Sequence, residues 1–192
     1  MLAANSIFNV LSPDHVKRVR LAIGETTAIT HRGTALGLSI DTFAVPGKIA
    51  LFLEDASAGQ DLGTRAGDTV GLKVTATASG RSFYYLPACA AIDPHLRQRL
   101  RGSALVFFDG TLYADDELVR QGLSDKTGRR MGHMSMSGGD GTIAEFADLD
   151  VARRVFVHIN TSNPVLIEGS PERRQVEQAG WEIAFDGMEV EL

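Results

Sequence analysis

Two short apolar runs in this chain each end at a side chain that can bind a metal or transfer a proton, and they constrain the fold more than any other feature. The segment Leu105–Thr111 (LVFFDGT) turns polar at Asp109, and the segment Val155–Pro164 (VFVHINTSNP) turns polar at His158. An apolar run that ends in this way is typical of a buried strand that delivers the polar group to one edge of a sheet. Ligands bind at that edge in open α/β sheets. The two runs therefore predict an α/β fold that carries part of a site.

Composition narrows the class of protein. The chain has 192 residues, 44% apolar and 22% charged, which suits one globular domain or a large piece of one. Its formal net charge of −5 gives no electrostatic support to a nucleic-acid partner. No apolar run approaches the roughly 18 residues that span a bilayer, and the first residues do not read as a signal peptide. One cysteine, Cys89, excludes an internal disulfide framework, so we expect a cytoplasmic protein without a membrane partner.

The patterns along the chain predict strands joined by turns first, and strands alternating with helices afterwards. The predicted strands are Val16–Leu21, Leu36–Leu53, Thr69–Thr77, Ser82–Leu86, Leu105–Phe108, Val155–Ile159, and a hairpin of Trp181–Phe185 with Met188–Val190. The predicted helices are residues 2–11, Pro94–Arg101 with Asp93 as its N-cap, Asp115–Gln121, Asp140–Leu149, and one from Ser170 to Gly180. This order favours one α/β layered domain.

His158 and Asp109 are the strongest candidates for chemistry. Neutral imidazole is a common ligand of zinc, iron and copper, so His158 is expected to bind a metal or to act in catalysis. The alternative is a structural histidine at a strand end, whose ring nitrogens form hydrogen bonds within the protein. Asp109 stands before Gly110, where backbone amides are free, and is expected to take part in catalysis. A turn-capping aspartate is the alternative there.

The segment Gly128–Gly138 (GRRMGHMSMSG) supplies further candidates. His133 follows a glycine that lets the backbone approach a ligand closely, although a surface loop histidine is the alternative. Arg129 and Arg130 are expected to meet an anionic small molecule, or else to form a solvated loop. Ser135 is a further candidate for binding substrate.

Three other polar residues have two interpretations each. Asn160 and Asn163 are expected to orient His158 or to bind substrate, but Asn before Pro is also common in turns. Cys89 would need a nearby base or a helix N-terminus to become a nucleophile, and a small buried thiol is the favoured interpretation.

The sequence contains no complete metal site. The motifs HxHxDH, HExxH and CxxC are all absent. One histidine and one aspartate do not hold a metal ion tightly without further ligands. We therefore expect that the remaining ligands of any metal come from residues outside this chain.

Together these segments resemble the coenzyme PQQ synthesis protein B family, within the metallo-β-lactamase fold superfamily. The resemblance covers nearly the whole chain and is most specific in GRRMGHMSMSG (128–138), HINTSNP (158–164) and the ending DGMEVEL (186–192). It extends to the C-terminal two-thirds of that family. It implies an αββα four-layer sandwich truncated at its N-terminal side, with 1–192 as a single incomplete domain. The first βαβ portion and the family's counterpart of the HxHxDH loop would then be missing.

The resemblance also assigns roles to residues and shows two departures. His158 matches the last metal-ligand histidine of the superfamily, and Asp109 and His133 match an acid and a Gly-His motif that serve substrate or proton transfer. The bridging aspartate of dinuclear members would fall near Ala88, and a further histidine near Gly47; both are missing. Because two metals would lose their shared ligand, the departures favour a single metal or none.

The function implied by the resemblance is a step in pyrroloquinoline quinone (PQQ) biosynthesis. The expected chemistry is hydroxylation of the tyrosine ring of a small, peptide-derived glutamate–tyrosine precursor at a single non-haem iron, with zinc as the alternative metal. A carrier of PQQ or its precursor to the periplasm is the runner-up, and a metal-dependent hydrolase is third. A homodimer is a further expectation. We expect the chain by itself to be inactive and poorly soluble.

Overall fold

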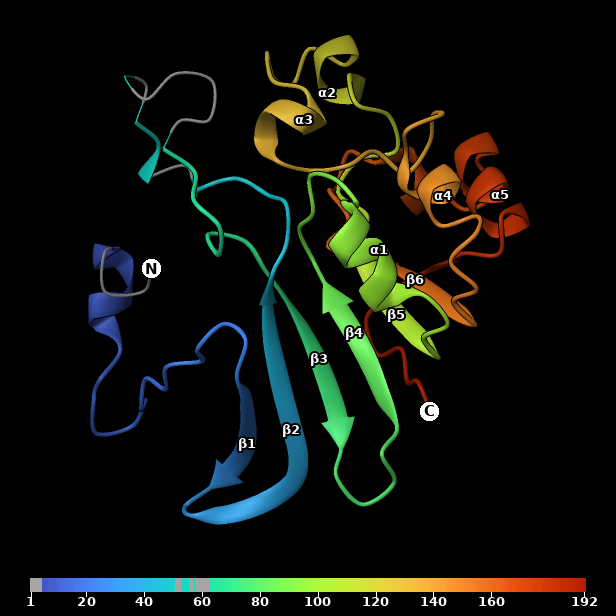
Figure 1. Cartoon of the computed structure of the whole chain (residues 1–192). Helices are drawn as coiled ribbons and strands as arrows, with labels where there is room; N and C mark the ends of the chain where they lie inside the picture. The colour runs from blue at the N-terminus through green and yellow to red at the C-terminus, as the bar shows by residue number, and fades with distance from the viewer. Residues whose placement is uncertain (1–4, 51–52, 56, 58–62) are drawn as a thin grey trace.

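The computed structural model describes residues 5–50, 53–55, 57 and 63–192. Within them lies one mixed sheet of seven strands in the order β1-β2-β3-β4-β5-β6-β7 (Figure 1). The strands are β1 (Thr26–His31), β2 (Thr34–Ala44), β3 (Val70–Ala76), β4 (Ser82–Leu86), β5 (Leu105–Asp109), β6 (Arg153–Val157) and β7 (Glu182–Ile183). Sequence neighbours are therefore also neighbours in the sheet.

The sheet changes from antiparallel to parallel at β4. Strands β1 to β4 pair antiparallel, and β4 to β7 pair parallel. Antiparallel neighbours need only a short turn, whereas parallel neighbours need a longer crossover, which here contains helices. This arrangement confirms the predicted order of hairpins followed by alternating strands and helices. It also brings the carboxyl ends of β4, β5 and β6 to one edge of the sheet, the upper edge in Figure 1.

The helices are short and are capped by their own sequence. They are η2 (Ser6–Val10), α1 (Pro94–Leu100), α2 (Glu117–Arg120), α3 (Gly128–Met131), α4 (Thr142–Glu145), η5 (Pro164–Leu166) and α5 (Pro171–Gln178). The Asp93 side chain accepts from the Leu96 amide, and Ser170 accepts from the Arg173 amide. Both predicted N-caps are confirmed, because each satisfies an amide that the first helical turn leaves free.

The core lies between one face of the sheet and the helices α1, α4 and α5. Alternation along β5 puts Val106 and Phe108 on this face. Trp181, which is 1% exposed, closes the core: its ring stacks on Phe156 at 4.0 Å between centroids and meets Phe146 edge-on at 4.9 Å. These aromatic contacts hold β6, α4 and the approach to β7 together.

The other face of the sheet is covered only in part. Phe83, Phe107 and Leu105 line a cavity of about 350 Å³ together with the C-terminal segment from Ala184 to Leu192. Tyr85 is 38% exposed on the strand beside Phe107. The described residues thus form one sheet and one layer of helices of the αββα arrangement.

Several local predictions differ from the structure. Residues 16–21 form no strand: Val16 and Val19 are exposed, and none of the described strands pairs with this segment. The predicted C-terminal hairpin is wrong as well: the turn at Asp186–Gly187 exists, but β7 pairs parallel with β6, and residues 188–190 form no strand. Strand β1 was missed because TTAITH lacks apolar alternation.

The remaining differences concern where elements begin and end. Strand β2 ends at Ala44, before the predicted end, and Leu51 and Phe52 lie outside the described residues. Part of the predicted helix over residues 2–11 is the 3-10 helix η2, and residues 1–4 also lie outside the described part. Strand β6 runs two residues earlier than predicted, which leaves His158 just beyond its end. Among the described residues, no helix has the length and apolarity needed to cross a membrane.

The aromatic core gives a stability prediction. In Trp181→Ala the stacking on Phe156 is lost and a large cavity remains, so we expect the free energy of unfolding to fall by about 3–5 kcal/mol. Leu123→Ala is the control, since Leu123 is 62% exposed, and a change of only about 0.5 kcal/mol is expected there. Urea unfolding followed by circular dichroism measures both. Equal losses in the two variants would contradict the assignment of Trp181 to the core.

Glu117 gives a prediction about pH. Its Oε2 accepts from the amides of Tyr113 and Ala114, while its Oε1 is buried without a partner among the described residues. Burial raises the pKa of Glu117, against the opposing effect of the amide hydrogen bonds. The folded state therefore holds this proton more tightly than the unfolded chain does, and the free energy of unfolding falls as the pH rises above the ordinary pKa of glutamate.

We expect this part of the pH dependence to disappear in Glu117→Gln, because glutamine carries no charge. The measurement is urea unfolding of the chain and the variant between about pH 4 and pH 7. Glu168→Gln, at an exposed position, should follow the unsubstituted chain. Parallel curves for the chain and Glu117→Gln would show that the buried carboxyl does not contribute.

Candidate metal centre

The polar residues singled out in the sequence meet where the parallel strands end. Strand β5 ends on Asp109, strand β6 ends one residue before His158, and His133 follows α3. The helices α2 and α3 lie above this edge of the sheet (Figure 1). Asp109, His133 and His158 therefore come together from segments that are 24 and 49 residues distant from Asp109 along the chain.

Asp109 is the buried centre of this group. Its side chain has no exposed surface. Oδ1 accepts from the Thr111 amide at 3.1 Å and lies 2.6 Å from the Thr111 hydroxyl. Oδ2 accepts from the Cys89 amide at 3.1 Å and lies 2.7 Å from His133 Nδ1. Burial by itself would raise the pKa of Asp109, but the contacts with His133, His158 and Thr111 outweigh it and lower the pKa.

The loop after α3 places His133 against this carboxylate. Gly132 caps the helix with φ of 87°, a conformation that glycine adopts without strain. A side chain there would also collide with Lys48, because an added Cβ would lie 2.6 Å from the Lys48 Cβ. The turn brings the imidazole of His133, which is 16% exposed, to Asp109. The glycine before this histidine is thus required by both the turn and the packing.

His158 reaches the same place by a different backbone conformation. Its φ of 55° lies in the left-handed region, where a residue other than glycine is uncommon. Its ring is 54% exposed and stacks on His133 with 5.5 Å between centroids. Nδ1 lies 3.8 Å from Asp109 Oδ1, and the carboxylate raises the pKa of His158, against the opposite effect of partial burial.

Thr111 is the functional residue that the sequence did not reveal. Its Oγ1 lies 2.6 Å from Asp109 Oδ1, 3.1 Å from His133 Nδ1 and 2.9 Å from His158 Nδ1. One hydroxyl therefore touches all three members of the cluster. The only signal in the sequence was its place two residues after Asp109, which is equally typical of a turn.

The two predicted asparagines lie beneath and beside this loop. Asn163 is 1% exposed; its amide group donates to the carbonyls of Gly110 and Thr111, and its Oδ1 accepts from the Val165 amide. Asn160 donates through its backbone to the Thr111 carbonyl and through its side chain to Ser162. Both hold the segment that carries Thr111. As substrate-binding residues they stay predictions.

Cys89 and Ser135 also lie near the cluster. The Cys89 thiol is buried, and burial raises its pKa to about 12, which confirms the interpretation as an inert buried thiol. Its contribution to the site is its backbone amide, which donates to Asp109. Ser135 is half-buried and donates to the Ser137 carbonyl, so its hydroxyl has a partner within the protein. Its role in binding substrate stays a prediction.

The donor set of the cluster suits a transition metal. One donor atom from each of Asp109, His133 and His158 lies within 4.8 Å of the others. Two imidazoles and a carboxylate are ligands that zinc and non-haem iron accept. Both oxygens of Asp109 already have two partners each, so this carboxylate orients the histidines more than it offers a free lone pair. Among the described residues, this set thus offers three side chains, where the sequence analysis considered one histidine and one aspartate.

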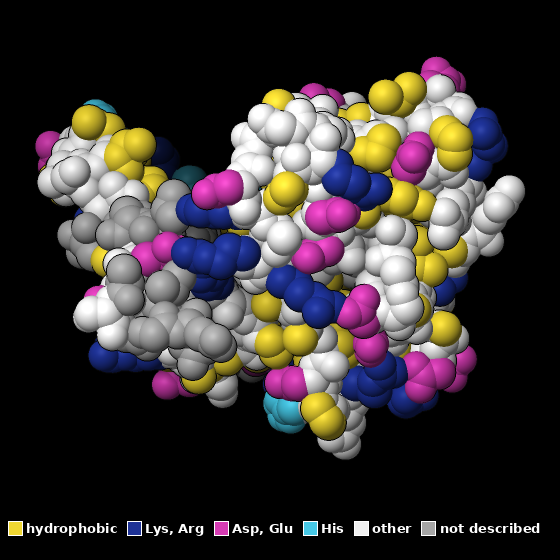
Figure 2. All heavy atoms as spheres, turned by 90° about the horizontal axis from the view of Figure 1, so that it is seen from above, with side chains coloured by type: hydrophobic (Ala, Val, Ile, Leu, Met, Phe, Trp, Pro, Cys, Tyr) yellow, Lys and Arg dark blue, Asp and Glu magenta, His cyan; other side chains and the backbone are white. Residues whose placement is uncertain are grey.

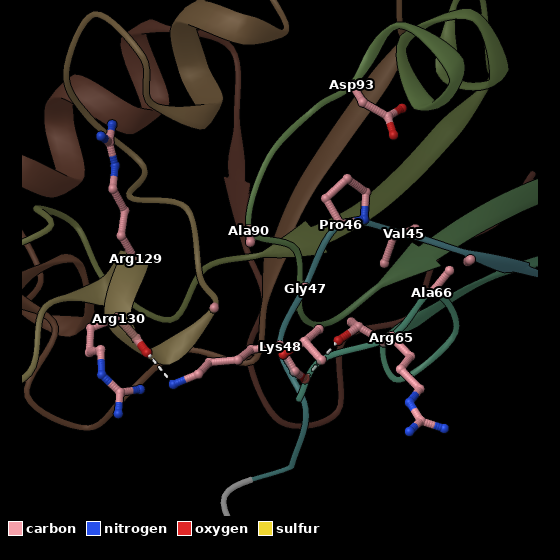
Figure 3. Close-up of a pocket in the computed structure, with 14 residues that line it drawn as sticks. Val45, Pro46, Gly47, Lys48, Arg65, Ala66, Ala90, Asp93, Arg129 and Arg130 are labelled. Atoms are coloured by element: carbon pink, nitrogen blue, oxygen red, sulfur yellow. Dashed lines mark hydrogen bonds between the residues drawn. The ribbon is translucent and has the colours of Figure 1, made fainter. Parts of the chain in front are cut away.

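A pocket of about 470 Å³ opens beside the cluster. Its lining includes Gly132 and Ala90, the neighbours of His133 and Cys89, together with Lys48, Arg129 and Arg130 (Figure 3). The view onto this edge of the molecule shows basic side chains lying next to acidic ones (Figure 2). The pocket wall therefore carries basic side chains beside apolar ones such as Val45 and Pro46.

Internal ion pairs tie down part of this basic lining. Lys48 donates to the Arg130 carbonyl at 2.7 Å and pairs with Glu54 at 2.7 Å. Arg130 reaches the same carboxylate at 3.4 Å, and Arg129 pairs with Asp140. Lys48 and Arg130 thus share one acid, which leaves an excess of positive charge on this wall of the pocket.

Comparisons with known proteins agree with this geometry. A family profile described as the beta-lactamase superfamily domain matches residues 1–159. The chain belongs to the metallo-β-lactamase superfamily. The crystal structure of Zn²⁺-bound PqqB from Methylobacterium extorquens superposes with a TM-score of 0.87 at 43% identity, over all of this chain and 61% of that one. The metallo-β-lactamase fold protein YhfI from Bacillus subtilis, at 12% identity and a TM-score of 0.56, shares only the fold with this chain.

Sequence relatives point to the same family member. Coenzyme PQQ synthesis protein B of Bradyrhizobium diazoefficiens is 50% identical over 194 residues, covering 100% of this chain and 62% of the relative. The protein of the same name from Gluconacetobacter diazotrophicus is 51% identical over 191 residues, covering 99% of this chain and 61% of the relative. The chain is thus a homologue of PqqB that spans about three-fifths of the length of these relatives. The family resemblance and the fold class predicted from the sequence are confirmed.

The buried asparagine gives a testable prediction for the site. Asn163→Ala leaves the Gly110 carbonyl and the Val165 amide without their side-chain partner, while the Thr111 carbonyl keeps the Asn160 amide, so we expect the free energy of unfolding to fall by about 2–3 kcal/mol. Asn160→Ala is the matched control and should cost about 1 kcal/mol or less, because its side chain donates only to Ser162. Chemical unfolding measures both variants. A larger loss in Asn160→Ala would reverse the assignment.

Proposed function

We propose that this chain acts in PQQ biosynthesis as part of a PqqB-type, metal-dependent oxidative enzyme. The observation that carries the proposal is the cluster of Asp109, His133 and His158 at the carboxyl edge of the sheet, in a chain about 50% identical to PqqB proteins. The chain spans 62% of the length of one such relative. The specific reaction proposed is hydroxylation of the tyrosine ring of a glutamate–tyrosine precursor.

His158 is the proposed metal ligand. It is the more exposed of the two rings, and its partner His133 is the one tied directly to Asp109. The likeness to Zn²⁺-bound PqqB supports metal binding at a site of this kind. Zinc has no redox chemistry, so iron is the metal that suits an oxidation. Bound there, a non-haem iron would supply the oxygen chemistry that aromatic hydroxylation needs.

Asp109 and His133 form the proposed proton-handling pair. Hydroxylation by O₂ replaces a ring C–H bond with C–OH and releases the second oxygen atom as water, which consumes two electrons from an external reductant and two protons. A histidine held by a buried carboxylate is suited to taking up and returning protons. The contact of 2.7 Å between His133 Nδ1 and Asp109 Oδ2 supports this role.

The basic pocket is the proposed place for the carboxylates of the precursor. Arg129 and Arg130, which are proposed to meet an anionic ligand, line it together with Lys48. Guanidinium and ammonium groups bind carboxylates by charge-assisted hydrogen bonds. Because Gly132 connects the pocket to His133, a ligand held there would lie next to the cluster. Ser135, Asn160 and Asn163 remain predicted contacts.

A carrier of PQQ or its precursor is the second candidate. The basic pocket of about 470 Å³ favours it, because binding an anion there needs no metal. A two-metal hydrolase is disfavoured, since Ala88 and Gly47 occupy the places where the superfamily's bridging acid and further histidine are expected. Metal analysis and oxygen-dependent turnover separate the enzyme from the carrier. Cytoplasmic location and a homodimer stay predictions.

The metal-ligand role of His158 is tested by His158→Ala in a protein that spans the full length of its PqqB relatives. Losing one imidazole from an incomplete donor set should reduce bound iron or zinc by roughly tenfold or more and abolish hydroxylated product. The exposed His95, on α1, provides the control variant His95→Ala, which should keep both metal and product. The measurement is elemental analysis after equilibration with the metal, together with chromatography of the product. Unchanged metal content in His158→Ala would remove this residue from the ligand set.

A further inference from the structure

We infer that Thr111 is a positioning residue that sets the tautomer of His158, so that the ring offers its Nε2 lone pair to the metal. The inference rests on the proposed function only in taking His158 as the metal ligand. Thr111 itself does not bind the metal. It acts on the ligand His158 by fixing which ring nitrogen carries the proton.

The hydroxyl of Thr111 has one proton and two lone pairs to share among its neighbours. Its shortest contact is 2.6 Å, to Oδ1 of Asp109. A carboxylate only accepts, so the hydroxyl proton lies on this contact. The oxygen of Thr111 is then left with lone pairs alone for its contacts with the two histidines.

The second contact decides the protonation of His158. Its Nδ1 lies 2.9 Å from Thr111 Oγ1. Since this oxygen has no proton left to give, Nδ1 must carry one and donate it. In a neutral imidazole the other nitrogen, Nε2, then holds the lone pair. The tautomer that results is the one that ligates through Nε2.

No other described residue is placed to do this for His158. Among the described residues, Thr111 makes the only hydrogen bond to the ring, since Asp109 Oδ1 lies 3.8 Å from Nδ1, beyond hydrogen-bonding distance. The ring is also 54% exposed, so packing restrains it little. Asp109 therefore acts on His158 through Thr111, while it acts on His133 directly at 2.7 Å.

The loop that carries Thr111 is built to hold the hydroxyl in place. Asn163, buried beneath it, donates to the carbonyls of Gly110 and Thr111, and the Asn160 amide donates to the Thr111 carbonyl. A Cβ at Gly110 would lie 3.0 Å from the Val157 carbonyl oxygen, closer than most such contacts, so a side chain there would crowd the two strand ends. These backbone contacts thus hold the Thr111 hydroxyl beside the imidazole rings of His133 and His158.

The matched variants are Thr111→Val, which keeps the shape and removes the hydroxyl, and Thr111→Ser, which keeps the hydroxyl. The control is Thr142→Val, at a buried threonine whose Oγ1 has no partner among the described residues. Thermal unfolding checks that all three variants keep the fold. The full chain is used throughout.

The first readout is the tautomer of His158 in the metal-free chain, from long-range ¹H–¹⁵N correlation spectra assigned with His158→Ala. We expect the Nδ1–H form in the chain, Thr111→Ser and Thr142→Val, and a loss of this preference in Thr111→Val. An Nε2–H form in the unsubstituted chain would overturn the inference, whether or not Thr111→Val folds. Because neither metal nor substrate is present, this result is independent of the role in PQQ biosynthesis.

The second readout is the dissociation constant of Zn²⁺, measured by competition with a chelating dye. We expect it to rise about tenfold to a hundredfold in Thr111→Val, and to stay within about threefold in Thr111→Ser and Thr142→Val. Equal affinities in Thr111→Val and Thr142→Val would overturn the inference. If His158→Ala binds zinc normally while the unsubstituted chain shows the Nδ1–H form, His158 is not the metal ligand. The effect of Thr111 on the tautomer of His158 is then still supported.

Discussion

The burial of one carboxylate organises this edge of the molecule. Asp109 has no exposed surface, and a desolvated carboxylate is stable only when donors surround it. The donors come from three places: the Cys89 amide after β4, the amide and hydroxyl of Thr111 after β5, and the ring of His133 after α3. Segments distant in sequence must therefore converge on this point for the fold to be satisfied. The same contacts that stabilise the acid assemble the site.

The carboxylate treats the two histidines differently. His133 touches it directly and is 16% exposed, whereas His158 is reached through the Thr111 hydroxyl and is 54% exposed. This asymmetry gives one ring the surroundings of a proton-handling group and the other those of a ligand open to solvent. The basic pocket begins at Gly132, beside the shielded ring, so an anion bound there would lie close to the proton-handling pair.

Much of the site followed from local patterns. Asp109 and His158 stood out because each ends an apolar run, and His133 stood out because a glycine precedes it. The structure brings all three within one cluster. The sequence gives no such signal for Thr111, because a threonine after an Asp-Gly pair is ordinary turn chemistry. Asn163 was noticed for substrate binding, yet the structure shows it buried beneath the loop, since burial of a polar side chain depends on what packs over it.

The sequence by itself determined the helix caps at Asp93 and Ser170 and the order of hairpins followed by alternating strands and helices, because each of these depends on neighbours a few residues apart. Only the tertiary structure decided that one hydroxyl serves Asp109 and both imidazoles, and that His158 turns back through a left-handed backbone conformation. The physical reason is that periodicity in a sequence records which face of an element is buried. The meeting of particular side chains depends on strand register and on how the elements pack, which local patterns do not encode.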